Sequence, residues 1–98
     1  MILVTGSFTT KQEHLATALA LSVEHVHRSR SEPGCIAHAV HQDAENPLRL
    51  VFVEEWTDRA ALAAHFALPA SRAFAKSVAA LAAASPTINV FEASRVVV

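Results

Sequence analysis

Residues 53–66, VEEWTDRAALAAHF, combine the side chains that chemistry needs with an otherwise small and apolar stretch. They include the only tryptophan of the chain, Trp56, together with the carboxylate of Glu54 and the imidazole of His65. An imidazole titrates near neutral pH and can therefore accept and return a proton. A tryptophan offers a broad apolar face and one N–H donor. The three side chains together are typical of a site that binds an aromatic molecule and moves a proton.

The strand before the tryptophan is expected to direct these side chains to one face. In LRLVFVEEW, Phe52, Glu54 and Trp56 share a face because side chains alternate along a strand. If that face meets the helices, the carboxylate of Glu54 lies in an apolar layer and must be paired. The preceding strand, CIAHAVHQ, is separated from this one only by DAENP, which implies an antiparallel hairpin. An even register across the hairpin would place His38 beside Glu54.

The segment after the tryptophan predicts two helices separated by a proline. Asp58 is expected to cap the first helix, because an aspartate side chain accepts a hydrogen bond from a free N–H of the first turn. His65 lies about two turns into this helix, close in phase to Leu62, on the side expected to pack onto the sheet. Pro69 predicts a kink and a separate helix over residues 69–84, because proline lacks the N–H donor and clashes with the preceding turn.

The remaining segments complete the order of elements. ILVTGSF predicts a first strand, and a helix capped by Thr9 or Thr10 is expected to continue to about Arg30. SEPG is expected to break that helix, and TINVFEASRVVV predicts a last long strand. The order strand, helix, strand, strand, helix pair, strand is typical of the α+β class. It predicts a ferredoxin-like βαββαβ antiparallel sheet with helices on one face, in a single domain over residues 1–98.

The two strands of the expected hairpin are apolar on both faces. Ile36 and Val40 have one parity while Ala37 and Ala39 have the other, and the next strand repeats the pattern. A strand that is apolar on both faces is usually buried on both, but one layer of helices covers only one of them. We therefore predict a homodimer in which the open faces of two sheets pack together.

Composition and charge argue against several kinds of partner. The 98 residues carry a formal net charge of −1 at pH 7, without the basic surface that nucleic-acid binding needs. No uncharged run reaches the roughly 20 residues of a membrane span, and the first residues do not form a signal peptide. Cys35 is the only cysteine, which is typical of a reducing compartment. We expect a cytoplasmic protein with no nucleic-acid or membrane partner.

Four motifs in the middle of the chain resemble the antibiotic biosynthesis monooxygenase family. They are the EPGC turn, EEW at a strand end, AAHF in the next helix and SRAF after it, all between Glu32 and Phe74. The resemblance implies a dimeric α+β barrel whose subunits each hold an apolar pocket between sheet and helices. It also implies oxygenation of an electron-rich aromatic molecule by O2 without flavin, haem or metal.

The resemblance gives the conspicuous side chains roles in such a reaction. His65 would act as the base, Trp56 would stack on a quinol, anthrone or polycyclic phenol and offer its N–H, and Glu54 would orient His65 or a neighbouring group. The residues expected to line the substrate pocket are His38, Phe52, Leu62, Phe66, Phe74 and Val78.

No metal or organic cofactor is expected from the sequence. His38 and His41 have opposite parity on one strand, and His25 and His27 lie on different sides of one helix, so no pair of metal ligands is evident. The chain has two glycines, too few for a glycine-rich phosphate cradle.

Two alternatives stay open on the sequence. Trp56 and His65 can be packing residues, because a tryptophan at a strand end and a histidine on a helix often fill a core. The chain can also be a non-oxygenase member of the same barrel superfamily, either a small-ligand binding module or an isomerase. Oxygen uptake by metal-free protein after addition of hydroquinones would distinguish these functions.

Overall fold

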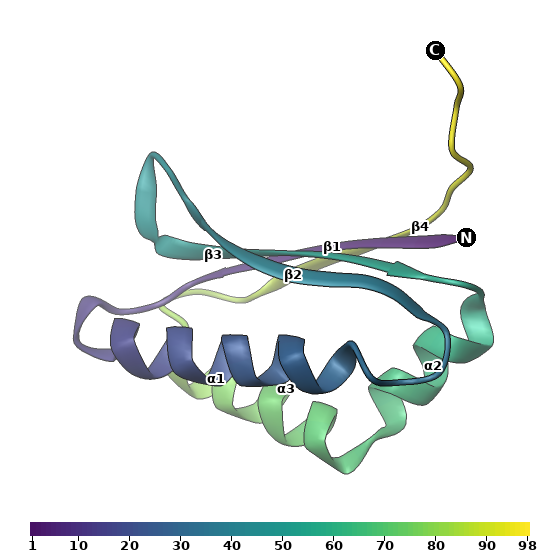
Figure 1. The fold of residues 1–98 in the computed structure, drawn as a ribbon. Helices are drawn as coiled ribbons and strands as arrows, with labels where there is room; N and C mark the ends of the chain where they lie inside the picture. The colour runs from purple at the N-terminus through teal and green to yellow at the C-terminus, as the bar shows by residue number, and fades with distance from the viewer.

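A four-stranded antiparallel sheet carries all of its helices on one face (Figure 1). The computed structural model describes residues 1–98. In chain order the elements are β1 (Ile2–Thr9), the short 3-10 helix η1 (Gln12–His14), α1 (Leu15–Ser29), β2 (Cys35–Asp43), β3 (Asn46–Trp56), α2 (Arg59–Ala67), α3 (Pro69–Leu81) and β4 (Thr87–Glu92). The strands lie in the order β2-β3-β1-β4, which confirms the ferredoxin-like α+β fold.

The residues predicted to begin α2 and α3 do so in the structure. Oδ1 of Asp58 accepts a hydrogen bond from the backbone N–H of Ala61 at 2.8 Å and so caps α2. Pro69 begins α3, and Leu68 between the helices has an extended backbone with ψ 137°. The predicted break between two separate helices is therefore confirmed. None of the helices combines the length and the apolar character that crossing a membrane would require.

Two predicted helix ends are wrong. Neither Thr9 nor Thr10 caps a helix: Thr9 ends β1, and the hydroxyl of Thr10 donates to the backbone carbonyl of Leu81 at 3.3 Å. Thr10 also forms an isolated bridge with Ala82, whose backbone is extended with ψ 140°. This bridge takes the chain out of α3 at Leu81, before the expected end at residue 84.

The last strand is also shorter than predicted. β4 ends at Glu92, which pairs with Ile2 near the start of β1. Ala93 still exchanges two backbone hydrogen bonds with Met1, at 2.9 and 3.0 Å, and residues 94–98 lead away from the sheet (Figure 1).

The turn between α1 and β2 depends on Gly34. Its φ of +82° lies in the left-handed region that residues with a side chain rarely adopt. A Cβ at this position would also lie 2.5 Å from Cβ of Ala61 and 2.8 Å from Oγ1 of Thr57. The turn thus approaches the start of α2 closely, and it carries Glu32 toward that helix.

The register of the sheet places a polar pair on the face covered by the helices. His38 of β2 lies directly opposite Glu54 of β3, and Val4 of β1 lies opposite Glu54 on its other side. Residues paired directly across antiparallel strands project to the same face. The even register considered for the hairpin is therefore the one present, and it brings a histidine and a carboxylate together inside the layer.

The layer between sheet and helices contains two apolar clusters. The first consists of Phe8, Ala18, Val26, Leu50, Phe52 and Val78. The second consists of Ile2, Val4, Trp56 and Leu62. Burial of these side chains supplies most of the driving force for folding.

The opposite face of the sheet is open. No element covers it (Figure 1), and Val53, Phe91 and, at the irregularity of β2 between Cys35 and Ala37, Ile36 are 39%, 50% and 53% exposed. A single chain thus leaves large apolar side chains in water on this face and along the sheet edge.

Candidate active site

A cavity of about 230 Å³ lies between the covered face of the sheet and the helices. Four phenylalanine rings contribute to its wall, and its polar side chains include two histidines and a carboxylate. The lining residues are Gly6, Ser7, Phe8, His25, Phe52, Glu54, His65, Phe66, Ser71, Phe74, Ala75, Val78, Pro86, Thr87 and Ile88. Four of the residues predicted to contact substrate are thus on the wall, namely Phe52, Phe66, Phe74 and Val78.

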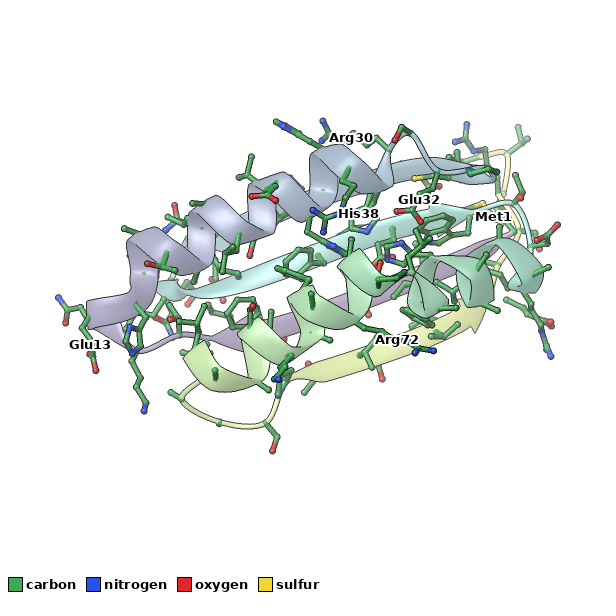
Figure 2. All side chains as sticks on the ribbon, turned by 90° about the horizontal axis from the view of Figure 1, so that it is seen from below. Met1, Glu13, Arg30, Glu32, His38 and Arg72 are labelled. Carbon is green, nitrogen blue, oxygen red and sulfur yellow. The ribbon has the colours of Figure 1, made fainter.

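His65 of α2 is held in one orientation by Glu32. Its Nδ1 lies 2.8 Å from Oε1 of Glu32, and the histidine is only 3% exposed. A carboxylate accepts but does not donate, so Nδ1 carries a hydrogen, and the lone pair of the neutral imidazole form lies on Nε2. His65 is therefore arranged to accept a proton through Nε2. Figure 2 shows Glu32, in the turn between α1 and β2, at the end of the sheet where α2 lies.

The carboxylate that orients His65 differs from the predicted one. Oε1 of Glu54 lies 3.9 Å from Nε2 of His65, too far for a hydrogen bond. Glu32 fulfils this role because the Gly34 turn returns the chain toward α2 immediately after α1.

Glu54 is a buried carboxylate with its own partners. Its Oε1 accepts a hydrogen bond from Nε1 of Trp56 at 3.0 Å and lies 3.2 Å from Nε2 of His38. Burial acts to raise the pKa of Glu54, but His38, Trp56 and His65 together outweigh burial and lower that pKa below its usual value. Glu54 is therefore an anion near neutral pH, at the base of the cavity.

Three residues predicted to contact substrate lie behind the cavity wall instead. Trp56 is 0% exposed, its N–H is used by Glu54, and its ring packs 4.6 Å from the ring of His65 between centroids. Leu62 packs with Trp56 in the second apolar cluster. His38 is 2% exposed and lies beneath His65 without reaching the cavity. The periodicity of the strand and the helix correctly predicts that these side chains point inward. Other side chains of the inner layer separate them from the cavity.

His25 of α1 is a functional candidate that sequence reasoning did not identify. Its ring stacks on Phe74 with centroids 4.1 Å apart, and its Nδ1 lies 3.2 Å from Nη2 of Arg28. A guanidinium only donates, so Nδ1 accepts and Nε2 carries the hydrogen. Burial, aided by the neighbouring His38, His65 and Arg28, lowers the pKa of His25 to about 3. His25 is thus a neutral hydrogen-bond donor on the cavity wall.

The three buried histidines come from three different elements. His25, His38 and His65 each offer a ring nitrogen, and these nitrogens all lie within 4.8 Å of one another. No pair of metal ligands was evident on one strand or helix, because the fold assembles this cluster from α1, β2 and α2. His25 was detectable in principle, since it shares the buried stripe of α1 with Ser22, Val26 and Ser29.

Comparisons with known proteins extend over most of the chain. Residues 1–77 match the family described as antibiotic biosynthesis monooxygenase. An uncharacterized protein of Synechocystis, sll1783, is 33% identical over 91 residues, which are 93% of this chain but 62% of that protein. A crystal structure of an antibiotic biosynthesis monooxygenase is 32% identical, with a TM-score of 0.89 over 97% of this chain and 100% of the other. A structure from Deinococcus radiodurans with the same family description is 26% identical, with a TM-score of 0.94 over 99% and 96% of the two chains.

Proposed function

The chain belongs to the antibiotic biosynthesis monooxygenase family, and on that premise we propose that it oxygenates a small electron-rich aromatic molecule with O2. The observation that carries the proposal is the orientation of His65. Its Nδ1 is fixed by Glu32 at 2.8 Å, which leaves the lone pair of Nε2 for a substrate proton beside a cavity with a mostly aromatic and aliphatic wall.

The proposed reaction balances without an external reductant. His65 removes a proton from a phenol or anthrone, whose carbanion form has enough electron density to reduce O2. The electron pair forms a C–O bond, and the resulting peroxide takes up a proton. A second proton then leaves the same carbon while the O–O bond breaks. A CH2 group and O2 thereby become C=O and H2O, so we propose that neither a metal nor an organic cofactor takes part in this step.

The cavity favours a small substrate. Its volume of about 230 Å³ is below the roughly 300–1,000 Å³ of pockets that hold drug-sized ligands. Phe52 and Phe74 lie with ring centroids 5.8 Å apart at an interplanar angle of 68°, which provides edges and faces for an aromatic ring. Among the substrate classes considered, a quinol with an unsubstituted ring position fits this space better than a polycyclic phenol.

His25 has a complementary role in the proposal. Its Nε2–H is the donor that remains after Arg28 occupies Nδ1, and its low pKa keeps the ring neutral. A neutral donor can stabilise the oxyanion of the substrate or the peroxide without introducing a competing acid. His65 and His25 thus divide proton acceptance and hydrogen-bond donation between two elements.

Oxygen consumption tests the proposal directly. Chelator-treated protein is mixed with a panel of hydroquinones and anthrone, and we expect one O2 consumed for each substrate oxidised and one ¹⁸O atom from ¹⁸O2 in the product. A His27→Gln variant is the matched control, because His27 is exposed on α1. An uptake rate equal to that of the protein-free reaction for every compound would contradict the proposed oxygenation.

A second function is favoured by the same pair of histidines. A proton acceptor and a proton donor on one cavity also suit an isomerase that moves a proton between two carbons. Exchange of a substrate C–H proton with deuterated water, without oxygen uptake, would favour the isomerase. Saturable binding without either reaction would favour a small-ligand binding module.

We also propose that two copies pair through their open sheet faces. Ile36, Val53 and Phe91 are exposed apolar residues, and their burial against a second copy would be favourable. Sedimentation equilibrium at micromolar concentration should give twice the mass of 10.5 kDa. A Val53→Glu variant should shift the protein toward the monomer, while a monomer in the unmodified protein would contradict the dimer.

A further inference from the structure

His38 is the least satisfied polar side chain of the inner layer. It is 2% exposed, and neither of its ring nitrogens has a hydrogen-bond partner. Its Nε2 lies 3.2 Å from Oε1 of Glu54, close enough for electrostatic attraction but misaligned for a hydrogen bond. A buried imidazole without a partner costs free energy unless something else binds it.

The surroundings of His38 supply other metal-ligand atoms. Oε1 of Glu54 lies 3.9 Å from Nε2 of His65, and the nearest nitrogens of His38 and His65 are within 4.8 Å. Ligands at about 2.0–2.1 Å from a tetrahedral zinc ion are separated by roughly 3.4 Å. Changes of about 0.2 Å, about 0.5 Å and at most about 1.4 Å in the three separations would bring these atoms to that spacing.

The hydrogen positions also suit metal binding. Nδ1 of His65 donates to Glu32, so its Nε2 lone pair is free for a metal, and the carboxylate behind the ring fixes its orientation. Glu54 is anionic and provides the charge that a divalent cation needs. His25 fits less well, because Arg28 occupies its Nδ1 and leaves a hydrogen on Nε2.

We propose that His38, His65 and Glu54 form a binding site for one divalent transition-metal ion, such as Zn²⁺ or Co²⁺, with Glu32 as the residue that positions His65. Two imidazoles and one carboxylate are an established ligand set for such ions and leave a coordination position open. The open position faces the cavity, since both His65 and Glu54 line it.

Metal binding has a consequence that rests on the proposed function. A metal ion on Nε2 of His65 uses the same lone pair that accepts the substrate proton. The ion and proton acceptance are therefore mutually exclusive, and the metal is expected to inhibit oxygenation instead of supporting it. The site would make activity sensitive to the free concentration of transition-metal ions.

The binding test uses a readout that does not depend on activity. Chelator-stripped full-length protein is titrated with Co²⁺, and the visible absorption of four-coordinate Co²⁺ is recorded. We expect saturation at one equivalent per chain and a metal-dependent rise in melting temperature. Glu32→Gln should weaken Co²⁺ binding about 10- to 100-fold, the usual effect of losing a residue that orients a ligand.

Matched variants locate the ion. His38→Gln and Glu54→Gln should each abolish the spectrum, while His41→Gln, an exposed histidine on the same strand, should retain it. His25→Phe should retain it as well, because Phe preserves the stack on Phe74. Circular dichroism of each variant confirms that it is folded, and Glu54→Gln replaces His38→Gln if the latter does not fold.

The outcomes separate the two proposals. Absence of a saturable Co²⁺ spectrum, or a spectrum unaffected by Glu54→Gln, overturns the metal site whatever the activity. A one-equivalent spectrum that depends on His38 and Glu54 supports it even if no substrate is oxidised. If oxygenation occurs and saturating Co²⁺ leaves its rate unchanged while the spectrum forms, the inhibitory consequence is overturned and the binding site stands.

Discussion

Two regions of the layer between sheet and helices differ in the chemical character of their buried side chains. At one end Leu50 and Phe8 pack against α1 and α3 in a cluster that has no ionisable side chain. At the other end His38, Glu54 and His65 lie at 2%, 6% and 3% exposure in an equally dry environment. The first arrangement gains free energy from apolar burial, whereas the second must offset desolvation with specific partners. Under the proposed oxygenation the polar end serves the chemistry, and the apolar end serves stability.

The largest expected effect is a loss of catalytic rate when His65, at the polar end, is replaced. His65→Gln retains an N–H donor for Glu32 but cannot accept a proton at neutral pH. If the proposed oxygenation is correct, oxygen consumption per folded chain should fall by roughly 10²–10⁴-fold, as is typical when a general base is removed. The melting temperature should change little. An unaltered rate in a folded variant would return His65 to a packing role.

The complementary change at the apolar end should act on stability alone. Leu50 is fully buried and does not line the cavity. Leu50→Ala should lower the free energy of unfolding by about 2–5 kcal/mol through lost burial and a residual cavity. Urea unfolding measures this change, and the rate per folded chain should be preserved. A loss of rate without a loss of stability would show that the two ends are coupled.

The sequence determines the apolar end and the order of elements more completely than the polar end. Asp58 and Pro69 act through their own backbone neighbours, so the cap of α2 and the start of α3 were predictable. The parity of β3 likewise places Glu54 and Trp56 on the inner face. The misplaced cap at Thr9 or Thr10 depends on a bridge to the end of α3, a contact between distant segments.

The partners of the polar residues were less accessible to sequence reasoning. Glu32 precedes a turn and has no periodic pattern, and it reaches His65 only because Gly34 folds the turn against α2. His25 has the phase of the buried stripe of α1, but a histidine among alanines and serines does not reveal a neighbour on β2. Which inward side chain reaches the cavity and which is covered, as Trp56 is, depends on the depth of packing.

A smaller effect is expected at Trp56, the buried tryptophan that donates to Glu54 at the polar end. Trp56→Phe removes the N–H that Glu54 accepts at 3.0 Å, leaving a buried carboxylate with fewer partners. The free energy of unfolding should fall by about 1–3 kcal/mol. Substrate affinity should change little, because the indole does not line the cavity. A raised KM with unchanged stability would instead support the stacking role predicted from the sequence.

The last effect is a gradual one, a pH dependence of stability that belongs to the polar end. The pKa of His25 is lowered from 6.5 to about 3, mainly by burial. Between these values the unfolded chain carries a proton that the folded chain does not, so the unfolded state binds more protons and stability rises with pH. The contribution is complete above about pH 6.5 and is lost progressively as the pH falls toward 3. Its slope is at most about 1.4 kcal/mol per pH unit.

His25→Phe tests this contribution because Phe keeps the stack on Phe74 but does not titrate. The groups that face His25 are Arg28 on its own helix and His38, Glu54 and His65 on the packed elements. Since all of these remain in the variant, the difference between the two stability curves isolates His25.

Urea unfolding from pH 7 to 4.5 with a chelator present should show the variant losing less stability than the unmodified protein as the pH falls. Exposed His27→Phe serves as the control and should follow the unmodified curve. Parallel curves for His25→Phe and the unmodified protein would mean that His25 takes up its proton in the folded state, which would remove the neutral donor from the proposed site.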